Sequence, residues 1–203
     1  MSDERLERQI GFILEIDRLK GVLRQSYLVG ADRRENSAEH SWHLAMMAVV
    51  LAEHANEPVD VAKVVGMLLV HDLVEVDAGD TYVYDAGAVA GQAERERRAA
   101  DRVFGLLPGD QGSELRGLWE EFEAAATPEA RFARALDRLM PVLHNVHTGG
   151  RSWREHGITA EQVIGRNGRI ADGSRELWDY ALGLIVSAFA NGRLGPAGGG
   201  RGR

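Results

Sequence analysis

A mostly apolar segment that is broken by a His-Asp pair constrains this chain more than any other feature of its sequence. Residues 64–70 are apolar apart from one glycine, His71 and Asp72 follow, and Leu73 and Val74 resume the pattern. The pattern predicts a buried helix, where an imidazole and a carboxylate are costly unless each finds a partner. Both side chains are metal ligands, so one divalent cation would satisfy both. The sequence therefore predicts a metal site inside the core.

Two further carboxylates follow the pair closely. Glu75 lies four residues after His71 and three after Asp72, so on a helix its carboxylate shares their face. Asp80 comes directly after Gly79, where the helix is expected to end. These four groups, within ten residues of such a segment, favour a functional site over an ordinary core.

Length and composition indicate an ordinary soluble globular protein. The chain has 203 residues, of which 44% are hydrophobic and 27% charged. We expect residues 1–193 to form a single domain and the Gly/Arg-rich segment 194–203 to be disordered. The formal net charge is -7 and no long basic stretch occurs, which disfavours bulk nucleic acid as a partner.

The chain contains no cysteine, which excludes disulfides and thiolate metal sites. Any metal must therefore be held by nitrogen and oxygen ligands. The N-terminal residues are charged, unlike a signal peptide. The longest apolar run, Leu44 to Ala52, is far shorter than the roughly 20 residues of a membrane helix. We therefore expect a cytoplasmic protein with no membrane partner.

Helical periodicity dominates the chain from end to end. Thr127-Pro128-Glu129 is typical of a helix start, and Thr159 with Gln162 predicts a capping box. No strand-like alternation of useful length occurs, and segment 26–37 is expected to be a loop. The predicted fold class is all-α, a bundle of roughly seven helices.

Two residues outside the His-Asp segment complete a candidate ligand set. His40 lies at the start of the second predicted helix, and Asp137 lies on the helix that Thr127 opens. Together with His71 and Asp72 they come from three helices, each at the edge of an apolar stripe. Such a set can converge on one ion inside a bundle.

The order His40, His71-Asp72, Asp137 on a helical chain resembles the HD-domain metal-dependent phosphohydrolases. Four short segments are similar to those of the subgroup that contains the bacterial 5'-deoxynucleotidases: Glu35-Asn36, Glu39-His40-Ser41, His71-Asp72-x-x-Glu75 and Gly79-Asp80. The resemblance covers roughly residues 10 to 145 and implies an HD-domain helical bundle.

The resemblance also implies residue roles. The metal ligands would be His40, His71, Asp72 and Asp137, and the catalytic acidic residues Glu75 and Asp80. Arg24 matches the arginine that orients the phosphate. The sequence departs from the best-characterised type at Gln25, where that type has a tryptophan that contacts the nucleotide.

Three other residues are candidates near the site. Arg33 and Arg34 precede the helix of His40 and are predicted to contact phosphate, the alternative being that they are simply solvated. His144 lies two turns beyond Asp137, and whether it supports the metal ligands stays open.

The resemblance implies one divalent transition-metal ion. Some HD-domain phosphohydrolases hold two metals through additional histidines between the His-Asp pair and the final aspartate, and this chain has no histidine between Asp72 and Asp137. Two imidazoles and two carboxylates suit Mn, Co, Fe, Ni or Zn.

The favoured function is hydrolysis of a phosphomonoester, most simply a 2'-deoxynucleoside 5'-monophosphate. One alternative keeps the site and changes the substrate to another nucleotide or small phosphoester. A second alternative is a non-catalytic helical binding module that the metal only stabilises. Helix faces outside the core could support a homodimer.

Overall fold

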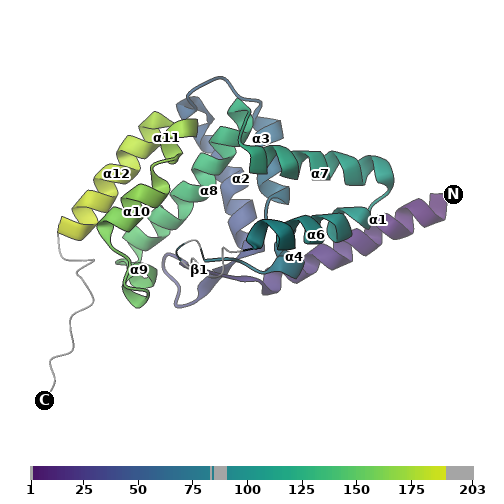
Figure 1. The fold of residues 1–203 in the computed structure, drawn as a ribbon, viewed down its shortest axis with the longest axis horizontal. Coiled ribbons are helices and arrows are strands. Elements are labelled where there is room, and N and C mark those ends of the chain that lie inside the picture. Colours follow the sequence, from purple (N-terminus) through teal and green to yellow (C-terminus); the bar gives the residue numbers. More distant parts are fainter. Residues whose placement is uncertain (1, 83, 85–90, 191–203) are drawn as a thin grey trace, which may run out of the picture.

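Helices that come from every part of the chain pack around one long central helix (Figure 1). The computed structural model describes residues 2–82, 84 and 91–190. The segment 194–203, which was expected to be disordered, lies outside the described residues. The elements are α1 (Ser2–Ile16), η1 (Asp17–Gly21), β1 (Leu23–Tyr27), β2 (Arg34–Asn36), α2 (Ser37–Leu51), η2 (Ala52–His54), α3 (Val61–Val70), α4 (Glu75–Ala78), α6 (Gln92–Gly105), α7 (Gly109–Ala124), α8 (Pro128–His147), α9 (Arg151–Glu155), α10 (Ala160–Asn167), α11 (Ile170–Gly173) and α12 (Arg175–Ala190).

The predicted all-α class is confirmed. Eight helices in the described ranges have at least eight residues, close to the roughly seven expected, and the short segments α4, α9 and α11 add to them. None of the described helices combines the length and the apolar character that crossing a membrane would need.

The central helix is α8, which packs against α2 and α3 on one side and α11 and α12 on the other (Figure 1). It begins as the sequence predicted, because the Thr127 Oγ1 accepts a hydrogen bond from the Ala130 N–H and Pro128 occupies the first turn. Its buried stripe includes Phe132, Leu136 and Leu139. A helix buried along this length fixes where Asp137 lies relative to α2 and α3.

Two hydrophobic clusters form the core. The larger joins α2, α3, α8, α11 and α12, and the smaller joins α1, α4, α6 and α7. Both clusters run through α3, which supplies Met67 to the larger and Val70 to the smaller. Residues 71–74, which follow α3 directly, therefore lie at the junction of the two clusters.

The helix that carries His71 is not continuous, and the prediction that it runs to Gly79 is wrong. α3 ends at Val70, residues 71–74 form turns, and α4 begins at Glu75. The N–H of Leu73 donates to the carbonyl of Val70 at 3.1 Å, and the N–H of Glu75 donates to that of Asp72 at 2.9 Å. These bonds span three residues rather than four, so the chain is wound more tightly here than in an α-helix. α4 then ends at Gly79, which has a φ of 72°, as the sequence predicted.

Segment 26–37, expected to be a loop, contributes to a small antiparallel sheet. β1 pairs with β2, with Leu23 opposite Asn36 and Tyr27 opposite Arg34. The strands were missed because neither shows apolar and polar alternation. β2 leads directly into α2, where the Asn36 side chain accepts from the Glu39 N–H and the Glu39 carboxylate accepts from the Asn36 N–H. The sheet therefore brings Arg24 on β1 beside the start of α2.

Close backbone contact between α11 and α8 predicts that Gly173→Ala is destabilising. An added Cβ would lie 2.2 Å from the Arg131 carbonyl oxygen and 2.8 Å from the Phe132 Cα, so the two helices would have to separate. We expect a loss of about 1–3 kcal/mol in the free energy of unfolding, measured by denaturant titration. Gly117→Ala in α7 is the control, because no described atom lies within 4 Å of its Cβ position and alanine should stabilise the helix by about 0.5–1 kcal/mol. Equal losses in the two variants would contradict this packing.

Candidate functional site

The four predicted metal ligands come together at the centre of the fold. His40 lies on α2, His71 and Asp72 follow α3, and Asp137 lies on α8. The His40 Nε2 is 3.0 Å from the Asp137 Oδ1, and the His71 Nε2 is 3.0 Å from the Asp72 Oδ1. The His71 Nε2 also lies 3.8 Å from the Asp137 Oδ1. Two nitrogens and two carboxylates from three parts of the chain therefore face a common point.

The orientation of the His71 imidazole suits metal binding. The His71 Nδ1 lies 2.8 Å from the Leu68 carbonyl oxygen, so an Nδ1–H can donate there and leave Nε2 as the nitrogen that faces the carboxylates. That Nε2 is buried and has no hydrogen-bond partner among the described residues. A cation would satisfy the buried nitrogen together with the facing carboxylates, so these residues fit a transition-metal ion.

Arg24 is the guanidinium that faces these carboxylates. Its Nη1 donates to the Asp72 Oδ2 at 2.7 Å and lies 3.8 Å from the Glu75 Oε1 and 3.9 Å from the Asp80 Oδ1. Its Nη2 lies 3.8 Å from the Asp137 Oδ1. Burial opposes the charge of Arg24, but the four carboxylates outweigh it and raise the pKa of the guanidinium. One guanidinium for four carboxylates leaves an excess of negative charge that favours an added cation.

The same charges shift the titration of the His-Asp pair. Burial alone would lower the pKa of His71, but Asp72 and Asp137 raise it to about 9. Burial would raise the pKa of Asp72, but His71 and Arg24 lower it to about 2. Both side chains thus favour their charged forms, as expected in a site that is to hold a cation.

The two predicted catalytic carboxylates lie beside the ligands and behave differently from them. Burial raises the pKa of Glu75 well above its usual range, and Asp72 raises it further. Burial also raises the pKa of Asp80, although Arg24 partly offsets this. The Ser37 hydroxyl donates to the Glu75 Oε2 at 2.6 Å, which fixes the direction of that carboxylate. Both groups can hold a proton closer to neutral pH than an exposed carboxylate does.

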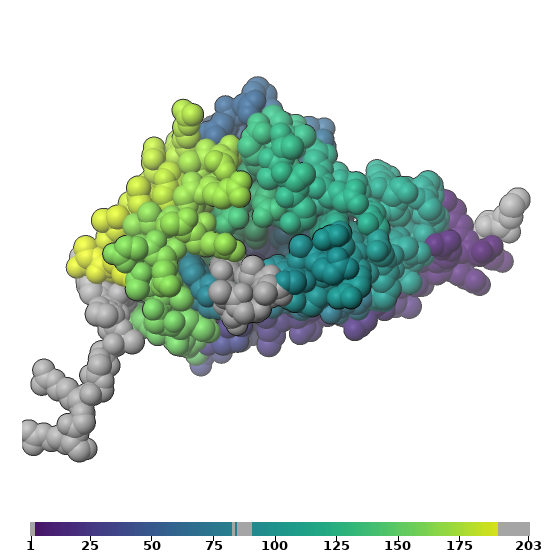
Figure 2. Space-filling view, in the orientation of Figure 1, coloured from purple at the N-terminus to yellow at the C-terminus, as the bar shows by residue number. Residues whose placement is uncertain are grey.

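A cavity of about 400 Å³ opens beside these groups. Figure 2 shows the surface hollowed between α6 on one side and α8 and α10 on the other, the elements that supply much of the cavity wall. Arg24, Asp72, Glu75, Asp80 and Asp137 line it. A small substrate could therefore reach the ligands, the arginine and both predicted catalytic carboxylates from one opening.

Arg33 and Arg34 lie away from this cavity. Arg33 pairs with Glu39 at the surface, with Nη1 2.9 Å from the Oε2. Arg34 lies over the Tyr27 ring, with its guanidinium carbon 5.7 Å from the ring centre. Neither is among the described residues that line the cavity, so their placement gives no support to a contact with phosphate.

Several residues near the site were not singled out in the sequence as parts of it. Arg134, Arg138 and Arg166 line the cavity from α8 and α10. Their only signal is the spacing of Arg134 and Arg138, four residues apart on one helix face, which any solvated helix can show. His144, by contrast, was a candidate from the sequence; it is buried and faces Glu35, with its Nδ1 3.8 Å from the Glu35 Oε2.

A family model described as "HD domain" matches residues 16–178. The chain belongs to the HD-domain family. The resemblance that the sequence showed to HD-domain metal-dependent phosphohydrolases is thus confirmed, and with it the predicted helical fold.

This HD-domain protein is similar to proteins that are named 5'-deoxynucleotidases. It is 31% identical over 145 residues to the 5'-deoxynucleotidase HDDC2 of Bos taurus, covering 70% of this chain and 69% of the relative. It is 31% identical over 133 residues to the 5'-deoxynucleotidase HDDC2 of Homo sapiens, covering 65% and 64%. Among solved structures, a predicted metal-dependent phosphohydrolase from Magnetospirillum magnetotacticum MS-1 is 51% identical, with a TM-score of 0.91 over 97% of this chain and 98% of that one.

Metal binding at this centre should require His71 and should tighten as the pH rises. Because the carboxylates raise the pKa of His71 to about 9, a metal must displace a proton from it at lower pH. We expect the affinity for Co²⁺ to rise roughly tenfold per pH unit between pH 6 and 8 and to level off above 9. Isothermal titration calorimetry in buffers of different ionisation enthalpy would measure both the affinity and the proton release.

The His71→Ala variant should lose this binding, whereas His54→Ala should keep it, because His54 pairs with Glu176 at the surface. An affinity that does not change between pH 6 and 8 would contradict the proton displacement.

Proposed function

We propose that this HD-domain protein removes the phosphate from 2'-deoxynucleoside 5'-monophosphates. The observation that carries the proposal is the arrangement on one cavity wall: a candidate metal centre, a buried arginine, and two carboxylates whose pKa burial raises. A phosphomonoester needs these three kinds of group for charge neutralisation, positioning and proton transfer. The relatives named 5'-deoxynucleotidases support the choice of substrate.

His40, His71, Asp72 and Asp137 would hold one divalent transition-metal ion, of which Mn, Co, Fe, Ni and Zn all suit the ligand set. When bound, such an ion polarises a phosphoryl oxygen and lowers the pKa of water. His71, Asp72 and Asp137 line the same cavity as Arg24, so an ion that they held would lie near that guanidinium.

Arg24 would bind the substrate phosphate. Its side chain is only 13% exposed, so the positive charge is little screened by solvent. A phosphate oxygen that enters the cavity can accept from the guanidinium, which already points at the ligand cluster through its bond to Asp72. Arg24 would thereby hold the phosphorus in line for attack.

Glu75 and Asp80 would divide the movement of protons. One positions and deprotonates the attacking water, and the other protonates the departing ribose oxygen. The raised pKa of both groups allows either role near neutral pH. The hydroxyl of Ser37 would keep Glu75 in place during the reaction.

We treat residues 1–193 as a single domain. The two core clusters support this, because α3 and α7 contribute residues to both. A homodimer, a cytoplasmic location and the absence of a bulk nucleic-acid partner stay predictions from the sequence. The alternative of a purely structural metal is disfavoured, because four protein ligands already suffice for such an ion and would leave Glu75 and Asp80 without a role.

A second candidate substrate is a nucleotide that carries another phosphate. Arg134, Arg138 and Arg166 line the same cavity as the metal ligands. Burial lowers the pKa of Arg138, and the neighbouring guanidinium groups lower it further, although Asp137 opposes them. An anionic group on the substrate would relieve this repulsion. Gln25 also lines the cavity and replaces the tryptophan of the best-characterised type, which favours a different base contact.

Changing Glu75 to alanine should separate chemistry from metal binding. Glu75 is assigned to proton transfer, so the variant should keep its fold and its metal but lose turnover by about a hundredfold or more. Phosphate release and metal content measured on the same sample would test this. Glu114→Ala, at an exposed position, is the control. Loss of the metal from the Glu75 variant would instead make Glu75 a ligand.

A nucleotide panel should decide the substrate. A wall close to C2' would deprive a ribose 2'-hydroxyl of its hydrogen bonds to water, at a cost of roughly 1–3 kcal/mol. We therefore expect kcat/KM for dAMP to exceed that for AMP by about tenfold to a hundredfold, with several bases accepted. Equal values would reject the deoxynucleotidase proposal and leave a phosphohydrolase of other substrates.

The same panel tests the second candidate when it includes nucleoside 3',5'-bisphosphates. If the arginines bind a second phosphate, the bisphosphates should give the higher kcat/KM, and Arg138→Gln should remove that advantage. Unchanged preference in this variant would rule out the role of Arg138.

A further inference from the structure

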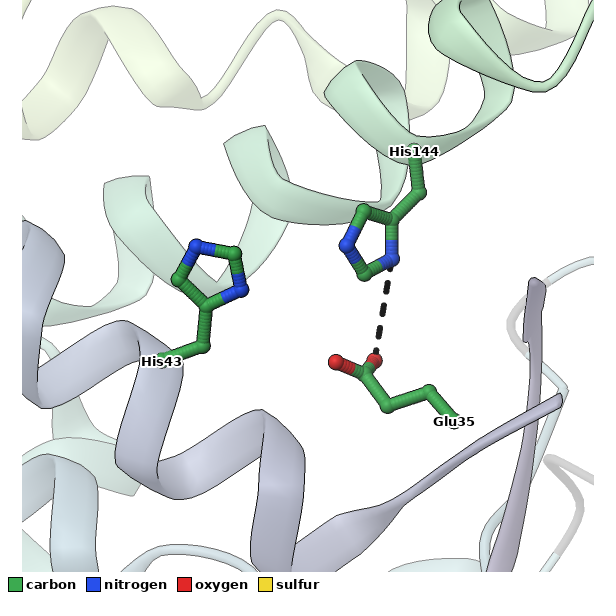
Figure 3. Close-up of side chains that lie close together, drawn as sticks. All are labelled: Glu35, His43 and His144. Carbon is green, nitrogen blue, oxygen red and sulfur yellow. Dashed lines mark ion pairs between the residues drawn. The ribbon is translucent and has the colours of Figure 1, made fainter. Parts of the chain in front are cut away.

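Three side chains outside the first metal centre face one another around a buried carboxylate. They are Glu35 on β2, His43 on α2 and His144 on α8, and Figure 3 shows both rings turned toward the carboxylate region. One ligand atom from each lies within 4.8 Å of the others. The Glu35 Oε2 is 3.8 Å from the His144 Nδ1, and the His43 and His144 ring centres are 6.0 Å apart. We refer to these three residues as the Glu35 cluster.

The buried atoms of the Glu35 cluster lack hydrogen bonds. Glu35 is 1% exposed and His144 5% exposed. The Glu35 Oε2 and the His144 Nδ1 have no hydrogen-bond partner among the described residues. A separation of 3.8 Å is too long for a direct hydrogen bond between them. Because burying such atoms alone is costly, a ligand that bonds to both at once would be stabilised there.

The chemistry of these atoms favours a cation. Within 4 Å, the described ion-pair partners of Glu35 are His40 and His144, and neither is an arginine or a lysine. The buried His144 Nδ1 has no hydrogen-bond partner among the described residues, and a neutral imidazole can offer such a nitrogen to a cation as a lone pair. A carboxylate and neutral imidazoles are ligands for metal ions of the transition series.

We propose that Glu35, His43 and His144 bind a second divalent transition-metal ion. Two nitrogens and one oxygen favour Zn²⁺, Co²⁺ or Ni²⁺ over Mg²⁺ and Ca²⁺, which prefer oxygen ligands. His43 is exposed, so an ion can enter from solvent on that side and keep water in its remaining positions. The prediction of one metal rested on the absence of histidines between Asp72 and Asp137. The residues of this second set lie outside that interval.

The same elements build both sites. His43 follows His40 by three residues on α2, and His144 follows Asp137 by seven on α8, so each pair lies on one helix face. Glu35 lies between them, with its Oε2 3.4 Å from the His40 Nδ1. The packing of α2 on α8 that assembles the first centre therefore also holds the second set of ligands.

Metal stoichiometry tests the proposal without reference to activity. Chelator-treated protein should bind one more equivalent of Zn²⁺ than its His43→Gln variant, measured by calorimetry and elemental analysis. His43 is exposed, so the variant should fold normally. Losing the outer hydrogen-bond partner of a metal ligand lowers metal affinity by roughly 10- to 100-fold. Losing the ligand His43 itself should lower the affinity of the second site by more than that. His147→Gln is the matched control, an exposed histidine on the same helix as His144.

An Asp72→Ala background isolates the second site, because it removes a predicted ligand of the first. One equivalent of Co²⁺ should remain, with visible absorption bands that disappear when His43→Gln is added. If the His43→Gln and His147→Gln variants bound metal with equal stoichiometry and affinity, the proposal would be overturned. The Glu35 cluster would then be a hydrated polar pocket without a metal ion. Phosphate release is measured separately, so its failure would count against the proposed function and not against the second ion.

Discussion

Negative charge buried around Arg24 is the constraint on which the rest of this structure depends. Four carboxylates lie within 4 Å of that guanidinium, in surroundings that are otherwise core: those of Asp72, Glu75, Asp80 and Asp137. Burying unpaired carboxylates would cost several kcal/mol each, so the fold can form only where compensating groups are brought to them. Arg24 and the two imidazoles supply part of that compensation, and a bound cation would supply the rest. Because these groups come from β1, α2, the turns after α3, α4 and its C-terminal end, and α8, tertiary packing and the site form together.

The backbone meets this constraint through irregular structure at two places. The tight turns after Val70 aim His71 and Asp72 at the cluster and set Glu75 at the start of a new helix. The β1–β2 pair holds Arg24 beside the entrance of α2, where the capping box of Asn36 fixes the first turn and so the direction of His40. Regular helices would have been more stable locally, but they would have pointed these side chains elsewhere.

Residue pattern and resemblance together were enough to predict which residues the structure brings together at the first centre. His40, His71, Asp72 and Asp137 converge as expected, and Arg24, Glu75 and Asp80 lie beside them. The hairpin was missed because its strands are specified by their neighbours and not by alternation. The break after Val70 was missed because apolar periodicity does not distinguish tight turns from a continuous helix. The Glu35 cluster was missed because its members lie far apart in sequence and each has an ordinary local explanation.

Glu35 connects the two sites physically. Its buried carboxylate faces the His40 Nδ1 at 3.4 Å, and an Nδ1–H that points toward it would leave the His40 Nε2 as the metal-binding nitrogen. The same oxygen faces the His144 Nδ1. A cation bound between Glu35 and His144 would therefore interact with the carboxylate charge that also orients His40. A change in the binding of one ion must then appear, by thermodynamic reciprocity, as an equal change in the binding of the other. Because the Glu35 carboxylate faces both His40 and His144, this coupling requires no movement of helices.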